Sequence, residues 1–410
     1  MADDPNFELK IQLTNEYLRT GGIQKIPDPA LLEDIINFNK DIPETITGRM
    51  RAFMNLTLHS HMRAPYFSEN AISEYKSLIQ KSYCFDQITI NTEEEFDKVY
   101  DEFKNSTEVL YRGQREAKWR LYSNLQRTWI LKELTKSGKT YQEFLETLVK
   151  DGLENFKDKI LELLEVHHID VINNIAVLGF LQHHGCPTPL LDWTYRFQNA
   201  LYFGLDGLTE NEGPLEIEDY FSVYYIKQKD MEGGGMRQVM DASLDELDAL
   251  HSAEVIAEVA KNEEQRKEME EHFKGRKIFD KDRIPGSGLI EYVTRISSMM
   301  GFPISFFSDK DAVTGFIFSL NNSKNILNQK GVFTWNASSF KPLEVVGAEI
   351  YLEEQNGLNS DDYRFSECLN INKKLVSYIL QRLDDEGITN DFIYPTKDID
   401  TWGIFEKAIK

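Results

Sequence analysis

The stretch that decides the fold is LQHHGCPTPLLDWTYRFQNALYFGL, residues 181–205, in which paired histidines, a cysteine and two prolines precede the triplet Asp192, Trp193 and Thr194. The prolines stiffen the approach to that triplet, and an apolar run follows it closely. A loop of this kind can hold a planar ligand between an acid, a hydroxyl and a large aromatic ring. The same residues also suit a structural role, in which Asp192 and Thr194 cap the following helix and Trp193 packs in the core. The local pattern leaves both interpretations open.

The length and charge of the chain limit the classes of protein to which it can belong. Its 410 residues, 41% of them hydrophobic, can bury a sizeable core and suggest two or three structural units. With 46 basic and 68 acidic residues the net charge is -22, which opposes docking on a phosphate backbone or on an anionic membrane. Non-specific binding to nucleic acid and binding to a membrane are therefore not expected.

The cysteines and the first residues indicate the cellular compartment in which the protein works. Cys84, Cys186 and Cys368 lie far apart, so neither a disulfide framework nor a cysteine-based zinc module is supported. The opening MADDPNFELK lacks the basic and apolar regions of a signal peptide, and no apolar stretch is long enough to span a bilayer. These features predict a cytoplasmic protein in a reducing setting.

Composition and hydrophobic periodicity indicate a helical region at 1–92, helices and strands at 93–229, a charged helical insertion at 230–283, and further helices and strands at 284–410. Together they predict an α+β fold. Thr92 is a candidate cap for a helix that follows it. Helical patterns are found at 28–42, 68–82, 93–105, 141–181 and 371–388, and strand-like patterns at 109–111, 219–229, 330–336 and 343–352.

The insertion at 230–283 is dense in charge and thin in apolar residues. A solvent-exposed pair of helices is the simpler interpretation, because such a charge pattern is typical of a solvated face. A helix that binds a protein partner is the alternative.

Metal binding is a second interpretation of the histidine pairs at 167–168 and 183–184, because imidazole and thiolate are good zinc ligands. The spacing argues against it, since neither His-x-x-x-His nor Cys-x-x-Cys occurs in the chain. We therefore expect no metal, and we expect hydrogen-bonded histidines that fix the loop.

Arg112 follows a strand-like run and precedes Gly113, which permits a sharp turn or a close backbone approach. An arginine so placed can clamp a phosphate or carboxylate through its fork of donors, or can pair with a structural aspartate. The next residues add a cationic and aromatic patch to an acidic protein, which favours a nucleotide or another anionic ligand. The patch comprises Arg115, Trp119, Arg120 and Arg127.

Three motifs together resemble the FRG domain family, which is named for its aromatic-Arg-Gly motif. They are LYRGQ at 110–114, the stretch at 181–205, and NQKGVFTW at 328–335, followed by GITNDFIYP at 387–395 as a closing segment. The resemblance is close over 93–210 and looser over 320–400. Pro189 stands where the family often has arginine, and Lys324 is the nearest basic residue before the third motif. Since the family occurs widely in bacterial and phage-linked proteins, the resemblance implies a toxin or a phage-defence effector.

The order of the motifs is also similar to that of ADP-ribosyltransferases with an Arg-Ser-Glu arrangement. The two resemblances together imply an α+β FRG domain in two parts, 93–229 and 284–410, with an ADP-ribosyltransferase-like mixed sheet as its core. In such a site Arg112 would hold a phosphate or ribose of NAD, and Thr194 would orient Arg112 and the ribose. Trp193 or Tyr202 would stack on nicotinamide. The resemblance thus implies catalytic roles for Arg112, Asp192, Thr194 and Gln329, and NAD-binding roles for Tyr111, Arg112, Gly113, Gln114, His183, His184, Trp193 and Tyr202.

A transferase of this kind needs a carboxylate to stabilise positive charge on the ribose. Gln329, in the third motif, carries no charge, so Asp192, Glu349 or Glu353 would have to supply it. The resemblance implies an NAD-consuming ADP-ribosyltransferase-like enzyme or an NAD glycohydrolase. The alternative is a non-enzymatic nucleotide sensor or a protein interaction module, with residues 230–283 as a surface for a protein partner. An open cleft lined by Arg112, Asp192, Trp193 and Gln329 would favour the enzyme.

Overall fold

A computed structural model describes residues 67–166, 172–211, 213–227, 235–274, 293–301, 303–308, 316–317, 323–354, 363–396 and 399–409. Within them a mixed eight-stranded sheet runs in the order β1-β8-β4-β2-β3-β7-β5-β6. The pairs β1/β8 and β5/β6 are parallel, and the other neighbours are antiparallel. The strands are β1 (Phe85–Ile90), β2 (Val109–Gln114), β3 (Leu190–Thr194), β4 (Tyr220–Lys227), β5 (Ile304–Ser308), β6 (Phe316–Ile317), β7 (Gly331–Asn336) and β8 (Ser366–Asn372).

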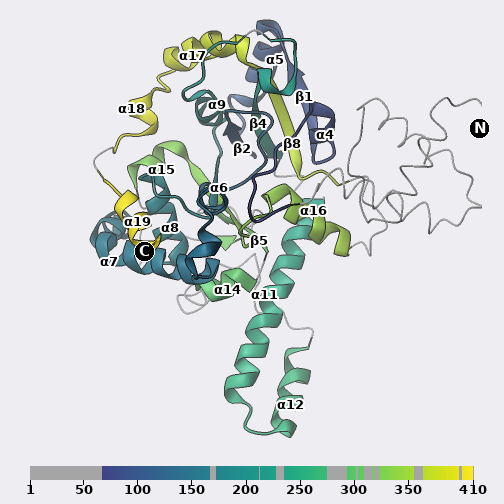
Figure 1. Cartoon of the computed structure of the whole chain (residues 1–410), viewed down its shortest axis with the longest axis vertical. Coiled ribbons are helices and arrows are strands. Elements are labelled where there is room, and N and C mark those ends of the chain that lie inside the picture. Colours follow the sequence, from purple (N-terminus) through teal and green to yellow (C-terminus); the bar gives the residue numbers. More distant parts are fainter. Residues whose placement is uncertain are drawn as a thin grey trace, which may run out of the picture.

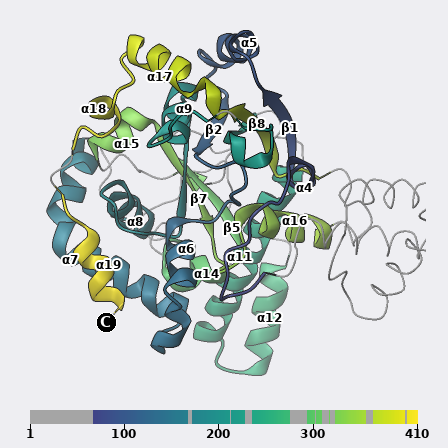
Figure 2. The ribbon, with the colours of Figure 1, turned by 45° about the horizontal axis from the view of Figure 1, so that its top comes forward.

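Helices cover both faces of this sheet, as Figures 1 and 2 show. The α-helices are α4 (Leu78–Ser82), α5 (Glu93–Phe103), α6 (Asn124–Leu131), α7 (Tyr141–Val166), α8 (Asn174–His183), α9 (Phe197–Leu205), α11 (Gly235–Val259), α12 (Glu263–Phe273), α14 (Ile296–Gly301), α15 (Lys324–Gln329), α16 (Leu343–Glu354), α17 (Val376–Asp385), α18 (Asn390–Ile393) and α19 (Trp402–Ile409). Short 3-10 turns are η1 (Leu134–Ser137), η2 (Ile217–Asp219) and η4 (Lys373–Leu375).

Alternation along the strands divides the core into three clusters. On one face, α5, α9 and α17 pack on β2, β4 and β8, while α7, α8 and α19 pack on β3, β5 and β7. The opposite face carries one cluster, to which α16 and the first turns of α11 contribute. One face of the sheet is thus covered by two separate groups of helices, and the boundary between the groups falls between β2 and β3.

The sheet opens into a fork at this boundary. Strands β2 and β3 pair at a single position, Tyr111 opposite Thr194. Beyond it β2 stays beside β4 as far as Gln114, while β3 runs beside β7 back to Leu190. The two halves of the sheet therefore share one rung and separate on one side of it.

Gly113 lets α9 lie directly on β2. A Cβ atom at this position would lie 1.8 Å from the carbonyl oxygen of Ala200 and 2.6 Å from the amide nitrogen of Gly204. No side chain fits there without moving the helix, so the glycine of the aromatic-Arg-Gly motif serves a close backbone approach.

Several predictions from the sequence are confirmed. Thr92 forms a capping box at the start of α5, strands β2, β4 and β7 occupy their predicted positions, and the described part of the insertion is helical. Helix α12 has no buried side chain, and the α11–α12 hairpin projects from the body (Figure 1). In the part of the chain that the structure describes, no helix is long and apolar enough to cross a membrane.

Other predictions are wrong. Only residues 78–82 of the helix expected at 68–82 are helical, and the N-terminal region expected to be helical contributes strand β1 to the sheet. The segment 343–352, expected to be a strand, belongs to helix α16, whose two faces contact α11 and β5. Asp192 lies in strand β3, and helix α9 has no side-chain cap. The helix expected at 28–42 and the histidines at 167–168 lie outside the described residues.

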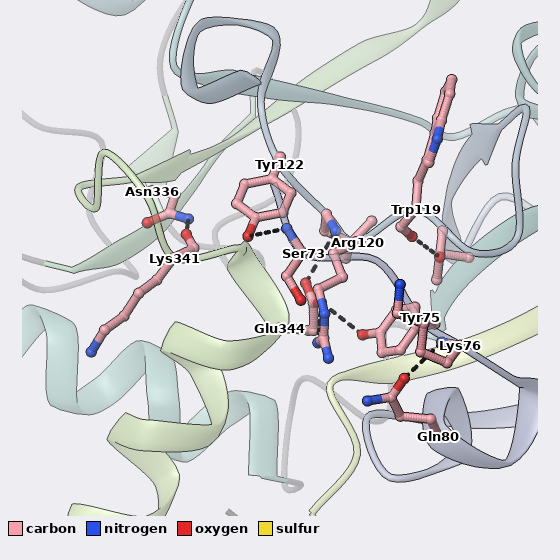
Figure 3. Close-up of polar contacts among 12 residues, drawn as sticks. Ser73, Tyr75, Lys76, Gln80, Trp119, Arg120, Tyr122, Asn336, Lys341 and Glu344 are labelled. Atoms are coloured by element: carbon pink, nitrogen blue, oxygen red, sulfur yellow. Dashed lines mark hydrogen bonds and ion pairs between the residues drawn. The ribbon is translucent and has the colours of Figure 1, made fainter. Parts of the chain in front are cut away.

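A buried ion pair joins three distant segments (Figure 3). Arg120 and Glu344 are both 0% exposed, with 3.3 Å between Nη1 and Oε1. Tyr75 donates a 2.7 Å hydrogen bond to the same carboxylate, and the amide of Leu121 donates one of 3.2 Å. The Arg120 guanidinium also lies 4.0 Å from the centroid of the Tyr75 ring. The pair thereby fixes the segment before α4 and the segment before α6 to the start of α16.

We expect Glu344→Gln to lower the free energy of unfolding by about 3–5 kcal/mol, because it leaves the Arg120 charge buried without its counter-ion. Urea denaturation would measure the loss. The matched control is Glu349→Gln on the same helix, where a 43% exposed carboxylate pairs with Lys341 and about 1 kcal/mol or less is expected. Equal costs at the two positions would contradict the role given to the buried pair.

Candidate functional site

A cavity of about 800 Å³ lies at the fork of the sheet. Its walls come from β2, from β3, from the segment between β2 and α6, and from the ends of α8 and α9. The segments around α15 and α18 close the remaining side. The lining residues include Arg112, Gly113, Gln114, Arg115, Trp119, Arg127, His183, His184, Asp192, Asp206, Asn325, Gln329, Asn390 and Tyr394.

Arg112 takes the place of a missing backbone hydrogen bond in the fork. Its Nη1 donates to the carbonyl oxygen of Asp192 at 2.6 Å, so the guanidinium binds the strand that β2 has left. Its Nε is buried and has no hydrogen-bond partner among the described residues. Burial lowers the pKa of Arg112, and the Asp192 charge opposes that shift. The group is therefore a buried cation whose donors are only partly used.

Asp192 and His183 face each other across the cavity wall. The distance from Asp192 Oδ1 to His183 Nε2 is 3.9 Å, and neither atom has a hydrogen-bond partner in the described structure. The aspartate side chain is 35% exposed, whereas that of His183 is 4% exposed. Burial lowers the pKa of His183, with Asp192 opposing, so the imidazole is neutral at pH 7. A carboxylate and a neutral imidazole thus lie together beside a buried cation, with polar atoms left to bind a ligand.

The FRG domain family model matches residues 107–212, which hold β2, β3 and most of the cavity walls. The chain contains an FRG domain. No curated protein and no solved structure matches the chain.

The cavity of the FRG domain gathers many of the residues predicted from the sequence. Arg112, Gly113, Gln114, His183, His184, Asp192 and Gln329 all line it. Of the three carboxylates considered for the ribose, Asp192 lines the cavity and Glu349 pairs with Lys341 elsewhere. Nothing is described for the Glu353 side chain.

The remaining predicted residues are not among those that line the cavity. Tyr111 and Trp193 are buried in the core, and the Trp193 indole donates to Thr334 Oγ1 at 3.2 Å, so neither ring is free to stack on a ligand. Thr194 is buried and donates to the carbonyl oxygen of Gln329 at 2.6 Å, which joins β3 to the third motif. Tyr202 is partly buried, and its hydroxyl accepts from Asn390 at 3.2 Å. The structure thus does not bring these four side chains to the cavity with Arg112 and Asp192.

One wall of the cavity comes from a segment far along the chain, around α18. Asn325 donates to the carbonyl oxygens of His183 and Thr396 at 3.1 and 3.3 Å. Gln329 donates to the carbonyl oxygen of Ile393 at 3.1 Å. These contacts bring Asn390 and Tyr394 to the cavity, where no sequence spacing places them. The signal that could have found them is the closing segment at 387–395.

In the described residues no group of three or more His, Cys, Asp or Glu side chains could hold a metal ion. Cys186 is buried and contacts the carbonyl oxygen of Pro187. The described residues that line the cavity offer guanidinium, carboxylate, imidazole, amide and hydroxyl groups.

Acid should destabilise the cavity wall through His184, whose pKa is lowered to about 4 by burial, by His183 and by Lys159. The unfolded chain binds a proton near the ordinary histidine pKa of about 6.5. Stability is therefore fully present above pH 6.5 and is lost as the pH falls toward 4. In His184→Gln the Tm should fall less than in wild type as the pH drops from 6.5 toward 4, and a series of melting curves against pH would measure this. The control His272→Gln, in exposed α12, should keep the wild-type slope. A wild-type slope in His184→Gln would contradict this assignment.

Proposed function

We propose that the FRG domain binds NAD in the forked cavity and cleaves the bond between nicotinamide and ribose, passing ADP-ribose to an acceptor or to water. The observation that carries the proposal is the convergence of the three motif segments. They lie on β2, on β3 and at the junction of α15 with β7, and these three strands are neighbours in the sheet. Arg112, Asp192 and Gln329 line one cavity as a result.

Asp192 supplies the carboxylate that the third motif lacks. When the bond between the ribose anomeric carbon and the pyridinium nitrogen breaks, the electron pair goes to nitrogen and nicotinamide leaves as a neutral molecule. Positive charge then grows on the ribose, and a fixed carboxylate at the cavity wall stabilises it. With its buried Oδ1 free of hydrogen bonds to described residues, Asp192 has an oxygen to offer.

His183 is placed to handle the proton of the attacking group. A hydroxyl of the acceptor, or water, attacks the ribose cation and loses a proton as the new bond forms. The neutral imidazole of His183 lies 3.9 Å from Asp192, and its Nε2 has no partner in the described structure. A neutral imidazole beside the reacting carbon can take up that proton as a general base.

Asp192→Asn keeps the shape of the side chain and removes its charge, so nicotinamide release should fall about 100-fold or more. The assay follows nicotinamide released from NAD by purified protein, with cell lysate as a source of acceptors. The control is Asp158→Asn, which changes an exposed aspartate on α7 and should turn over at the wild-type rate. A wild-type rate in Asp192→Asn would show that this carboxylate takes no part in the reaction.

The toxin or phage-defence setting belongs to the same proposal. Expression of the wild-type chain would then arrest bacterial growth, whereas expression of Asp192→Asn at the same level would not. Equal growth with both chains would count against a toxin.

A non-enzymatic nucleotide sensor is the second candidate, and the side chain of Gln329 favours it. Gln329 is 3% exposed, and its side-chain amide donates to the carbonyl oxygen of Ile393. The third motif thus serves to hold one wall of the cavity in place. In that case NAD raises the Tm and no nicotinamide is released. The projecting α11–α12 hairpin would then serve as the surface for a protein partner.

A further inference from the structure

A second guanidinium group faces the same cavity as Arg112. Arg127, on α6, lines the cavity and lies 4.4 Å from the centroid of the Trp119 ring. Burial, and after it the positive charge of Arg112, lower the pKa of Arg127 to about 10. Two like charges are thus held within reach of each other at the cavity wall.

No carboxylate in the described structure forms an ion pair with either group. Arg112 donates to the carbonyl oxygen of Asp192 at 2.6 Å, and Arg127 donates to that of Arg120 at 3.5 Å. Glu74, whose charge acts on Arg127, forms its ion pair with Lys118 at 3.5 Å. In a chain with 68 acidic residues, this leaves a pair of cations whose repulsion an anion in the cavity would relieve.

Side chains of both charges line the cavity. Arg112 lies beside Asp192, to whose backbone carbonyl oxygen it donates at 2.6 Å, and Arg127 lines the same cavity. The wall therefore carries negative charge at Asp192 and positive charge at Arg112 and Arg127. NAD suits both kinds of charge, since its nicotinamide ribose, which develops positive charge, is attached directly to a diphosphate.

The buried ion pair described above fixes the position of Arg127. Arg120 lies in the core with Glu344, and its backbone carbonyl accepts from Arg127. The backbone carbonyl oxygen of Trp119 accepts from the Gln114 side chain at 2.7 Å, which ties the Trp119 backbone to β2. The guanidinium of Arg127 thus stacks on a ring whose backbone is held on both sides.

We propose that Arg127 and Arg112 together bind the diphosphate of a dinucleotide and so orient its nicotinamide ribose toward Asp192. The direction of the ligand rests on the proposed function. The diphosphate subsite stands on the two guanidinium groups alone and can be tested without turnover. Arg127 is then a specificity-determining residue that a phosphate-free nucleoside does not use.

The test is binding of ADP-ribose, inorganic pyrophosphate and nicotinamide riboside to the full chain by calorimetry. We expect Arg127→Gln to weaken ADP-ribose and pyrophosphate at least about tenfold, because charge-assisted bonds to two phosphates are lost. Any binding of nicotinamide riboside should be unchanged. Arg127→Lys keeps the charge but loses the planar stack on Trp119. Its affinity for ADP-ribose should therefore lie between those of wild type and Arg127→Gln. The matched control is Arg266→Gln on α12, which should bind as wild type.

The outcomes separate this inference from the proposed reaction. If Arg127→Gln binds ADP-ribose as wild type does, or if wild type binds neither ADP-ribose nor pyrophosphate, the subsite is wrong, whatever the rate of nicotinamide release. If Arg127→Gln weakens both diphosphates while wild type releases no nicotinamide, the subsite stands and the reaction fails. If the Tm of Arg127→Gln without ligand equals that of wild type, a loss of affinity is not caused by misfolding. If that Tm falls, the affinity of Arg127→Lys for ADP-ribose is the test of the subsite instead.

Discussion

A single backbone pairing, Tyr111 opposite Thr194, holds the two halves of the sheet together, and the cavity exists because the pairing stops there. A strand that leaves its neighbour exposes carbonyl and amide groups that need other partners. Arg112 meets this need from the side chain, by donating to the carbonyl oxygen of Asp192. The residue that closes the gap in the sheet is therefore also the residue that brings positive charge to the cavity.

The far wall depends on side-chain amides. Asn325, Asn328 and Gln329, in or just before the third motif, bind backbone carbonyls of the segment around α18. Thr194 reaches back from β3 to the carbonyl oxygen of Gln329. An amide offers both a donor and an acceptor, so a short run of Asn and Gln can hold an irregular segment that has no ladder of its own. Hydrogen bonds to backbone thus hold this wall together with the packing of Ile393 in the core.

The sequence predicted the parts of the fold that local chemistry determines. The cap at Thr92 and the strand composition of β2 and β7 depend on neighbouring residues, and the structure has them. Helix α16 could not be predicted, because its β-branched and apolar residues are typical of a strand. A helix with so many apolar residues is favourable here only because it packs against both α11 and β5. Of the site, the motifs placed Arg112 and Asp192 in the cavity. They also suggested Trp193 as a stacking ring, since a motif does not reveal which side of a strand faces the core.

The unpaired polar atoms at the fork weigh against a purely structural role. Arg112 and Asp192 are close enough to interact, and a scaffold would gain most from a direct bond between guanidinium and carboxylate. Instead Arg112 binds the backbone carbonyl, while its Nε and Asp192 Oδ1 remain buried without a partner in the described structure. A buried polar atom that is left without any hydrogen-bond partner costs about 1–3 kcal/mol. A fold that only needed a rigid wall could remove both costs by forming the ion pair. Keeping the cation and the carboxylate apart, each with a free polar atom at one cavity, suits a ligand that carries negative charge at one end and develops positive charge at the other.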